Sequence, residues 1–253
     1  MLRRILIYLA LVVSAIRVGA VNPATEGNSV EARAARFFEY REWLSAGALY
    51  TMLLGDNPTN STYYGRAIVS AGMLGDSTQQ IVLTRQAFDS HVAVDSLFTA
   101  VERTSFSIGQ TSLYEHYLLR TKADEPWLTR IVDGYLMRYY SFRRDPAGMI
   151  AYSRIMLEGN PDNEQFLDTL AQGHLLAGQT DEALDIYRRI IEQNPRSLDA
   201  LLYLANYYLE RTPSDPSAAT QAIALFSQAR SIIDTPYINA ALLLLRSLTL
   251  SKK

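Results

Sequence analysis

The sequence predicts an all-α protein made of stacked helical hairpins, that is, an α-solenoid. An Asn-Pro pair at residues 160–161 recurs 34 residues later, and Leu167 and Leu170 have leucine counterparts at the same distance. A fixed period of this size is typical of repeated units that stack on one another. Apolar residues also recur at helical spacing from residue 29 onward, and no alternation of polar and apolar residues is long enough for a strand.

Short turn signals divide the helical pattern and predict eleven or twelve helices. Because the connections are short, sequential helices are expected to be antiparallel neighbours. The breaks are Gly55–Pro58, Gly75–Ser77, Asp124–Pro126, Asp145-Pro146, Asn160–Asp162, Gly178–Thr180, Asn194-Pro195 and Pro213–Pro216.

The first twenty residues have the features of a secretory signal peptide. A basic start at Arg3-Arg4 precedes the apolar run 5–16, and Val18-Gly19-Ala20 has the small residues of a cleavage site. As a helix the apolar run would span about 18 Å, which is too short for an unaided membrane crossing. We expect a cleaved signal peptide at 1–20 and a polar linker at 21–28. The alternative is an uncleaved N-terminal membrane anchor.

Composition limits the compartment and the partners. The chain has no cysteine, which excludes disulfides, thiol catalysis and zinc-thiolate sites. An export signal without cysteine favours the periplasm or cell envelope of a Gram-negative bacterium, with no stable transmembrane span after cleavage. The net charge is −2 without any long block of like charge, so a nucleic-acid partner is not predicted.

The clearest repeat covers residues 164–197. Its first helix places four residues on one face, and Gly178 is expected to end that helix in a left-handed conformation. Thr180 is expected to cap the next helix, in which the small Ala183 and the large Tyr187 lie on one face. Pro195 prevents continuation of that helix. The four residues of the first helix are Leu167, Leu170, Ala171 and His174.

This pattern resembles the tetratricopeptide repeat family. The resemblance continues through a second unit at Leu201, Leu204-Ala205, Tyr208, Ala222, Phe226 and Ala229. It is weaker upstream, where Gln80 and Thr84 occupy the positions of the small residue and the aromatic. We therefore divide the chain into a divergent helical region at 29–125 and repeats at 126–253, with a C-terminal capping helix at Tyr237–Leu250.

The resemblance implies a right-handed superhelix of helix pairs whose first helices line a concave face that binds peptides or protein segments. The positions beside the core residues are then the expected protein-binding stripe. The family's clamp for a terminal carboxylate is not predicted, because the stripe lacks Lys and Arg. A neutral polar groove would suit a partner without strong charge. The six stripe residues are Asp168, Thr169, Gln172, Leu202, Tyr203 and Asn206.

No catalytic, metal or cofactor site is predicted. The three histidines His91, His116 and His174 lack partners at metal-ligand spacing, and the sequence contains no phosphate loop and no nucleophile elbow. The predicted function is a non-enzymatic protein-interaction scaffold of the cell envelope. The alternatives are an accessory or regulatory subunit of an envelope enzyme or transporter and, with less support, a hydrolase in the divergent N-terminal half.

Overall fold

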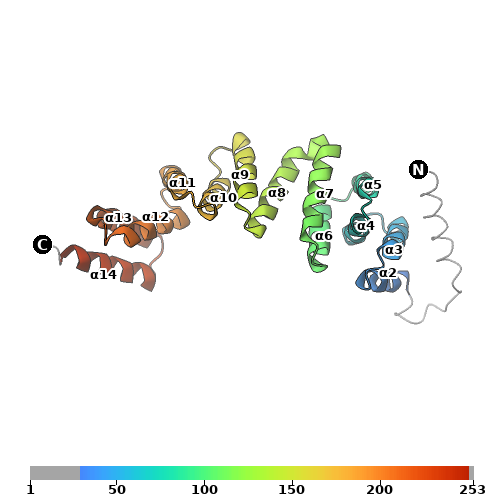
Figure 1. The fold of residues 1–253 in the computed structure, drawn as a ribbon, viewed down its shortest axis with the longest axis horizontal. Coiled ribbons are helices and arrows are strands. Elements are labelled where there is room, and N and C mark those ends of the chain that lie inside the picture. Colours follow the sequence, from blue (N-terminus) through green and yellow to red (C-terminus); the bar gives the residue numbers. More distant parts are fainter. Residues whose placement is uncertain (1–28, 251–253) are drawn as a thin grey trace. The chain divides into compact units, whose positions relative to one another are not determined.

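The computed structural model describes residues 29–250, which contain thirteen α-helices, one 3-10 helix and no strand (Figure 1). The expected signal peptide and linker lie outside the described residues. The helices are α2 (Val30–Glu39), α3 (Trp43–Asp56), α4 (Ser61–Met73), α5 (Ser77–Asp89), α6 (Val94–Ser107), α7 (Thr111–Asp124), η2 (Pro126–Leu128), α8 (Thr129–Arg143), α9 (Pro146–Gly159), α10 (Glu164–Leu176), α11 (Thr180–Gln193), α12 (Leu198–Arg211), α13 (Pro216–Ile232) and α14 (Pro236–Leu250).

By their internal contacts the described helices form two compact units, which divide between Val132 and Asp133. In the first unit α2 packs on α3, α3 on α4, α4 on α5, and α6 on both α4 and α7. In the second unit each helix from α9 to α14 packs on the next. Packing between sequential neighbours is what distinguishes a solenoid from a single globular core. The predicted all-α solenoid is therefore confirmed, while the predicted functional boundary at 125/126 stays a prediction.

The repeat period extends through the divergent region. The second helices of successive pairs, α3, α5, α7, α9 and α11, begin at residues 43, 77, 111, 146 and 180, so their spacing is 34 or 35 residues throughout. Helix count and boundaries thus follow one period, although the repeat motif is weak before residue 126. More helices are present than the eleven or twelve expected, because some of the turns carry no obvious sequence signal.

The turn inside each of these five hairpins has the same backbone geometry. One residue adopts positive φ, its amide donates to the carbonyl three residues earlier, and the next amide donates to the carbonyl five residues earlier. This is the Schellman motif, which satisfies the last carbonyls of a helix and reverses the chain. The five residues and their φ values are Arg41 (62°), Gly75 (71°), Gly109 (74°), Arg144 (52°) and Gly178 (76°).

The predicted core of the clear repeat is confirmed. Leu167, Leu170, Ala171, His174, Ala183 and Tyr187 are all buried, and so are Leu201, Leu204, Ala205, Ala222, Phe226 and Ala229. The predicted cap was wrong by one residue. Gln179, not Thr180, is the N-cap of α11, because the Schellman turn at Gly178 starts the next helix directly. The Oε1 atom of Gln179 instead lies 2.6 Å from Nδ1 of the buried His174.

The other second helices keep the same two core positions, but most of them place different residues there. Where α11 has Ala183 and Tyr187, α3 has Ala46 and Tyr50. The corresponding pairs of the other second helices have the larger side chain first, and all six side chains are buried. The two positions therefore stay in the core although the residues that fill them differ in size. These pairs are Gln80 and Thr84 in α5, Tyr114 and Leu118 in α7, and Met149 and Ser153 in α9.

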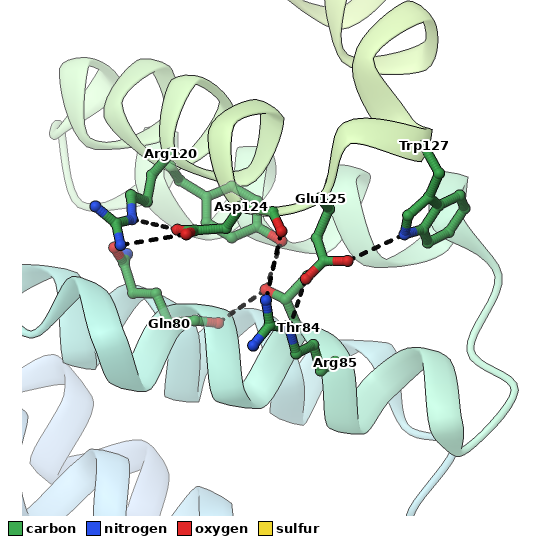
Figure 2. A network of polar contacts seen from close by, with 8 residues as sticks. Gln80, Thr84, Arg85, Arg120, Asp124, Glu125 and Trp127 are labelled. Atoms are coloured by element: carbon green, nitrogen blue, oxygen red, sulfur yellow. Dashed lines mark hydrogen bonds and ion pairs between the residues drawn. The ribbon is translucent and has the colours of Figure 1, made fainter.

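Polar contacts join α5 to α7 and η2 in the first unit (Figure 2). The Thr84 hydroxyl and the Tyr117 hydroxyl lie 3.0 Å apart in the core. At the surface, Arg85 Nε donates to Glu125 Oε1 at 2.5 Å, and Trp127 Nε1 donates to Glu125 Oε2 at 3.0 Å (Figure 2). The carboxylate of Glu125 thereby fixes the end of this hairpin onto the preceding one.

The last helix, α14, packs on α13 as expected of a terminal helix. Ile238, Ala241, Leu242 and Leu245 face the core, whereas Leu243 and Leu244 are 67% and 50% exposed. The buried side chains of α14 belong to one core with those of α12 and α13, and the predicted capping role of this helix stays a prediction.

Candidate functional site

The three stripe residues on α10 lie at or near the surface of the second unit. Asp168 is half-buried and accepts hydrogen bonds from Gln172 Nε2 at 2.6 Å and from the Tyr187 hydroxyl at 3.4 Å. The Thr169 hydroxyl donates to the Gln165 carbonyl of its own helix at 2.8 Å. Burial raises the pKa of Asp168, and the nearby Asp199 raises it further, while the bond from Tyr187 lowers it.

The three stripe residues on α12 divide into two surroundings. Tyr203 stacks on Tyr187, with ring centroids 4.3 Å apart, and this stack links it to Asp168. Leu202 packs against the core shared by α12, α13 and α14, and Asn206 accepts a hydrogen bond from the Tyr237 hydroxyl of α14. Gln172 is thus hydrogen-bonded directly to Asp168, and Tyr187 links Asp168 to Tyr203. It places Leu202 and Asn206 against the next helices.

A small cavity of about 320 Å³ lies beside this stripe, and Asp168 is the one stripe residue that lines it. Three carboxylates line the cavity. Glu164 Oε1 and Oε2 are already bonded to the Ser197 hydroxyl at 2.5 Å and to Asn194 Nδ2 at 2.8 Å. The surface here is acidic rather than neutral, unlike the groove expected from the sequence. The lining residues are Glu164, Gln165, Asp168, Tyr187, Ile190, Ser197, Asp199 and Ala200.

A larger groove of about 830 Å³ lies in the first unit, where the sequence predicted no site. It is formed by three successive first helices, α2, α4 and α6, together with the turn after α2. Its volume is within the range of about 300–1,000 Å³ that is usual for ligand pockets. Its lining residues are Phe38, Glu39, Arg41, Ser61, Thr62, Arg66, Asp95, Ser96, Thr99, Ala100, Arg103, Thr104, Ser107 and Ile108.

Gly65 shapes this groove by allowing α4 and α6 to approach closely. A Cβ atom on Gly65 would lie 2.8 Å from both the carbonyl carbon and the carbonyl oxygen of Ala100. Such a contact is too short for any side chain, so only glycine permits this spacing. The close approach brings Thr99, Ala100 and Arg103 of α6 beside Arg66 of α4 in one groove.

Arg66 is a half-buried charge of the groove that aromatic side chains hold in place. Its guanidinium lies over two aromatic rings, 5.3 Å from the centroid of Tyr50 and 5.8 Å from that of Phe38, and it donates to the Tyr50 hydroxyl. Cation–π contacts of this kind hold a guanidinium in place while leaving donors available. The sequence could not have revealed this site, because Tyr50, Phe38 and Arg66 come from three different helices with no motif in common.

Within residues 29–250, no group of three or more His, Asp or Glu side chains is placed to hold a metal ion. Over the same residues, no helix is both long enough and apolar enough to cross a membrane.

Comparisons with known proteins support the repeat identified from the sequence. Residues 164–207 match the sequence profile of the tetratricopeptide repeat, which covers α10, α11 and most of α12. No curated protein sequence matches this chain.

Several solved structures have a similar arrangement of helices. MamA from AMB-1 is 20% identical with a TM-score of 0.46, and the match covers 72% of this chain and 96% of that one. The C-terminal part of a TPR repeat-containing protein from Cytophaga hutchinsonii is 14% identical with a TM-score of 0.46, covering 81% and 79%. The Naa15/Naa10 complex bound to HypK-THB is 17% identical with a TM-score of 0.47, covering 90% of this chain and 34% of that one. At these TM-scores the similarities carry no argument about function.

Proposed function

We propose that this protein is a non-enzymatic interaction module that binds segments of partner proteins in the grooves of its first helices. The observation that carries this proposal is the groove of about 830 Å³ formed by α2, α4 and α6. Tetratricopeptide repeats generally mediate protein–protein contacts, and a groove that runs across successive first helices suits an extended segment.

The arrangement of side chains on α6, with some in the core and others in the groove, supports this function. On α6, Leu97, Phe98 and Val101 are fully buried in the core, whereas Thr99, Arg103 and Ser107 line the groove. These three residues of α6 are thus outside the core and available to a ligand. The groove has hydroxyls, guanidinium groups and two carboxylates, which are groups that hydrogen-bond to a protein segment.

We further propose that the module works in the bacterial envelope, as a scaffold in its assembly. This rests on the basic start, apolar run and small residues of positions 1–20. Cell fractionation and N-terminal sequencing of the mature protein test this location. A mature N-terminus near residue 21 in the periplasmic fraction supports it, and an intact Met1 in the cytoplasm contradicts it.

Site-specific crosslinking tests the binding function. A photoreactive residue replaces Ser96 in the first-unit groove or Gln172 on the α10 stripe, in the full chain in its native cells. Matched controls carry it at Val82 or Arg154, which are exposed on the second helices α5 and α9. We expect one partner to be captured from a groove position and not from the controls. Equal capture from all four positions, or capture from the controls alone, contradicts the proposed function.

A further inference from the structure

We propose that the groove of α2, α4 and α6 is selective for an acidic protein segment, and that Arg66 receives a carboxylate side chain of that segment. The proposal rests on the proposed function, since it names the chemistry of the segment that this groove binds. It is argued from the charges in the groove, from the position of Arg66 and from the contrast with the second cavity of the same chain.

Arg66 has no counter-ion in the part of the chain that the structure describes. Its side chain is half-buried between the rings of Phe38 and Tyr50. Within residues 29–250, no carboxylate forms an ion pair with it. A partly buried charge without a counter-ion is unfavourable, and one hydrogen bond to Tyr50 satisfies a single donor of the five on a guanidinium. A carboxylate that binds in the groove would satisfy two further donors in the fork geometry that guanidinium groups prefer.

The remaining charges of the groove also favour an anion. Arg41 and Arg103 line it, and neither is ion-paired within the described residues. Two carboxylates, Glu39 and Asp95, lie in the same lining, but Asp95 already has an interaction within the chain. Three arginines and two carboxylates therefore line the groove, an excess of one positive charge, and the potential of the groove is positive.

Hydroxyl groups around Arg66 complete a surface that suits anionic oxygens. Ser61 and Thr62 begin α4, and Ser96 and Thr99 lie on α6 across the groove. Hydroxyls donate to carboxylates readily and cost little to desolvate in comparison with charges. Apolar contact remains available from Phe38 and Ile108, so a segment with acidic and apolar residues fits best.

The cavity in the second unit has the opposite character. Glu164, Asp168 and Asp199 line it, and it contains no Arg or Lys. An acidic segment is therefore expected to select the first-unit groove over this cavity. The same contrast supplies an internal control, because both surfaces belong to one chain.

A random 12-residue peptide library displayed on phage tests the proposal with the full mature chain as bait. We expect the selected peptides to be enriched in Asp and Glu. A representative synthetic peptide should lose about tenfold in affinity when its acidic residue is changed to the amide. It should lose about the same when the protein carries Arg66→Gln, with affinity measured by fluorescence anisotropy at low salt.

Three further variants separate charge recognition from folding. Arg103→Gln removes an exposed groove charge without touching the rings, and we expect a loss of a few-fold. Arg66→Lys keeps the charge but not the fork, and we expect affinity between those of the wild type and Arg66→Gln. Arg154→Gln removes the same charge from exposed α9 in the second unit and should leave affinity within about twofold of the wild type.

The outcomes also separate this inference from the function on which it rests. Selected peptides without acidic enrichment, or binding that neither Arg66→Gln nor Arg103→Gln weakens, would overturn the acidic selectivity and leave segment binding intact. Equal weakening by Arg154→Gln would show non-specific charge attraction and would also overturn it. If no peptide binds at all, both this inference and the proposed function fail.

Discussion

Arg144 and Gly178 occupy the same position of successive hairpins, 34 residues apart, and both have positive φ, 52° and 76°. In each case the amide of the following residue donates to the carbonyl five residues earlier. The same turn conformation thus recurs with glycine and with arginine, although positive φ is unfavourable for arginine. The packing of the repeat, and not the residue type, therefore determines this conformation. A left-handed conformation costs a non-glycine residue about 1–2 kcal/mol.

The first prediction is that Arg144→Gly stabilises the protein by about 1 kcal/mol, since it removes this strain. Gly178→Ala should destabilise it by about 1 kcal/mol for the same reason. Urea unfolding followed by circular dichroism measures both. Arg143→Gly is the control, because residue 143 is the last residue of α8, where glycine lowers helix stability by up to about 1 kcal/mol. Destabilisation by both Arg-to-Gly changes would contradict the assignment of strain to Arg144.

These turns also explain how far the sequence predicts the fold. Gly75 and Gly178 predict the turns in which they lie, and leucine spacing predicts the core of residues 164–197. Arg41 and Arg144 give no such signal, although Asp145-Pro146 marks the second of these turns. The turn at Gly109 is not predicted from the sequence. Tyr114 and Leu118 occupy the positions at which the repeat has a small residue and an aromatic, so the motif is not recognisable there.

The candidate sites were likewise predictable only in part from the sequence. Sequence spacing placed Asp168 and Tyr203 on neighbouring first helices, but it did not indicate their link through Tyr187 or the contact of Asn206 with Tyr237. The groove around Arg66 depends on aromatic residues from two other helices and on the close approach at Gly65. Contacts between residues that are far apart in the sequence and share no motif cannot be predicted from a single sequence.

The second prediction concerns Gly65. Gly65→Ala should destabilise the first unit by about 1–3 kcal/mol, because its Cβ would lie 2.8 Å from the backbone of Ala100 and force α4 and α6 apart. Gly55→Ala is the matched control in α3, where a Cβ has no heavy atom within 4 Å. It should be stabilising by about 0.5–1 kcal/mol, from the lower entropy of the unfolded chain. Thermal unfolding compares the two; similar effects of both substitutions would exclude the close helix contact.

The third prediction concerns the core of the clear repeat. Ala183→Asp should destabilise the second unit by several kcal/mol, because Ala183 is fully buried between helices and a carboxylate there has no partner. Asp185→Ala, two residues later, alters an exposed carboxylate that pairs with Arg188 at 2.6 Å and should change the free energy of unfolding by less than about 1 kcal/mol. Unfolding in urea measures both. A normal unfolding midpoint for Ala183→Asp would refute the register of α11 on α10.

The fourth prediction uses the raised pKa of Asp168. A raised pKa in the folded state means that Asp168 favours folding while protonated, at pH values below its unfolded pKa of 3.8. That contribution is lost as the pH rises through the raised folded value. Asp168→Asn should therefore gain stability relative to the wild type between pH 3.5 and pH 7, as judged from urea midpoints at several pH values. Thr169→Ala, which changes no titrating group, should differ from the wild type by a constant amount. If the advantage of Asp168→Asn does not grow with pH, the pKa of Asp168 is not raised in the folded state. A half-buried carboxylate that lowers the stability of the folded protein is expected to serve in binding. In the crosslinking experiment, Asp168→Asn should accordingly lower the amount of partner captured from position Gln172, although this variant is more stable than the wild type.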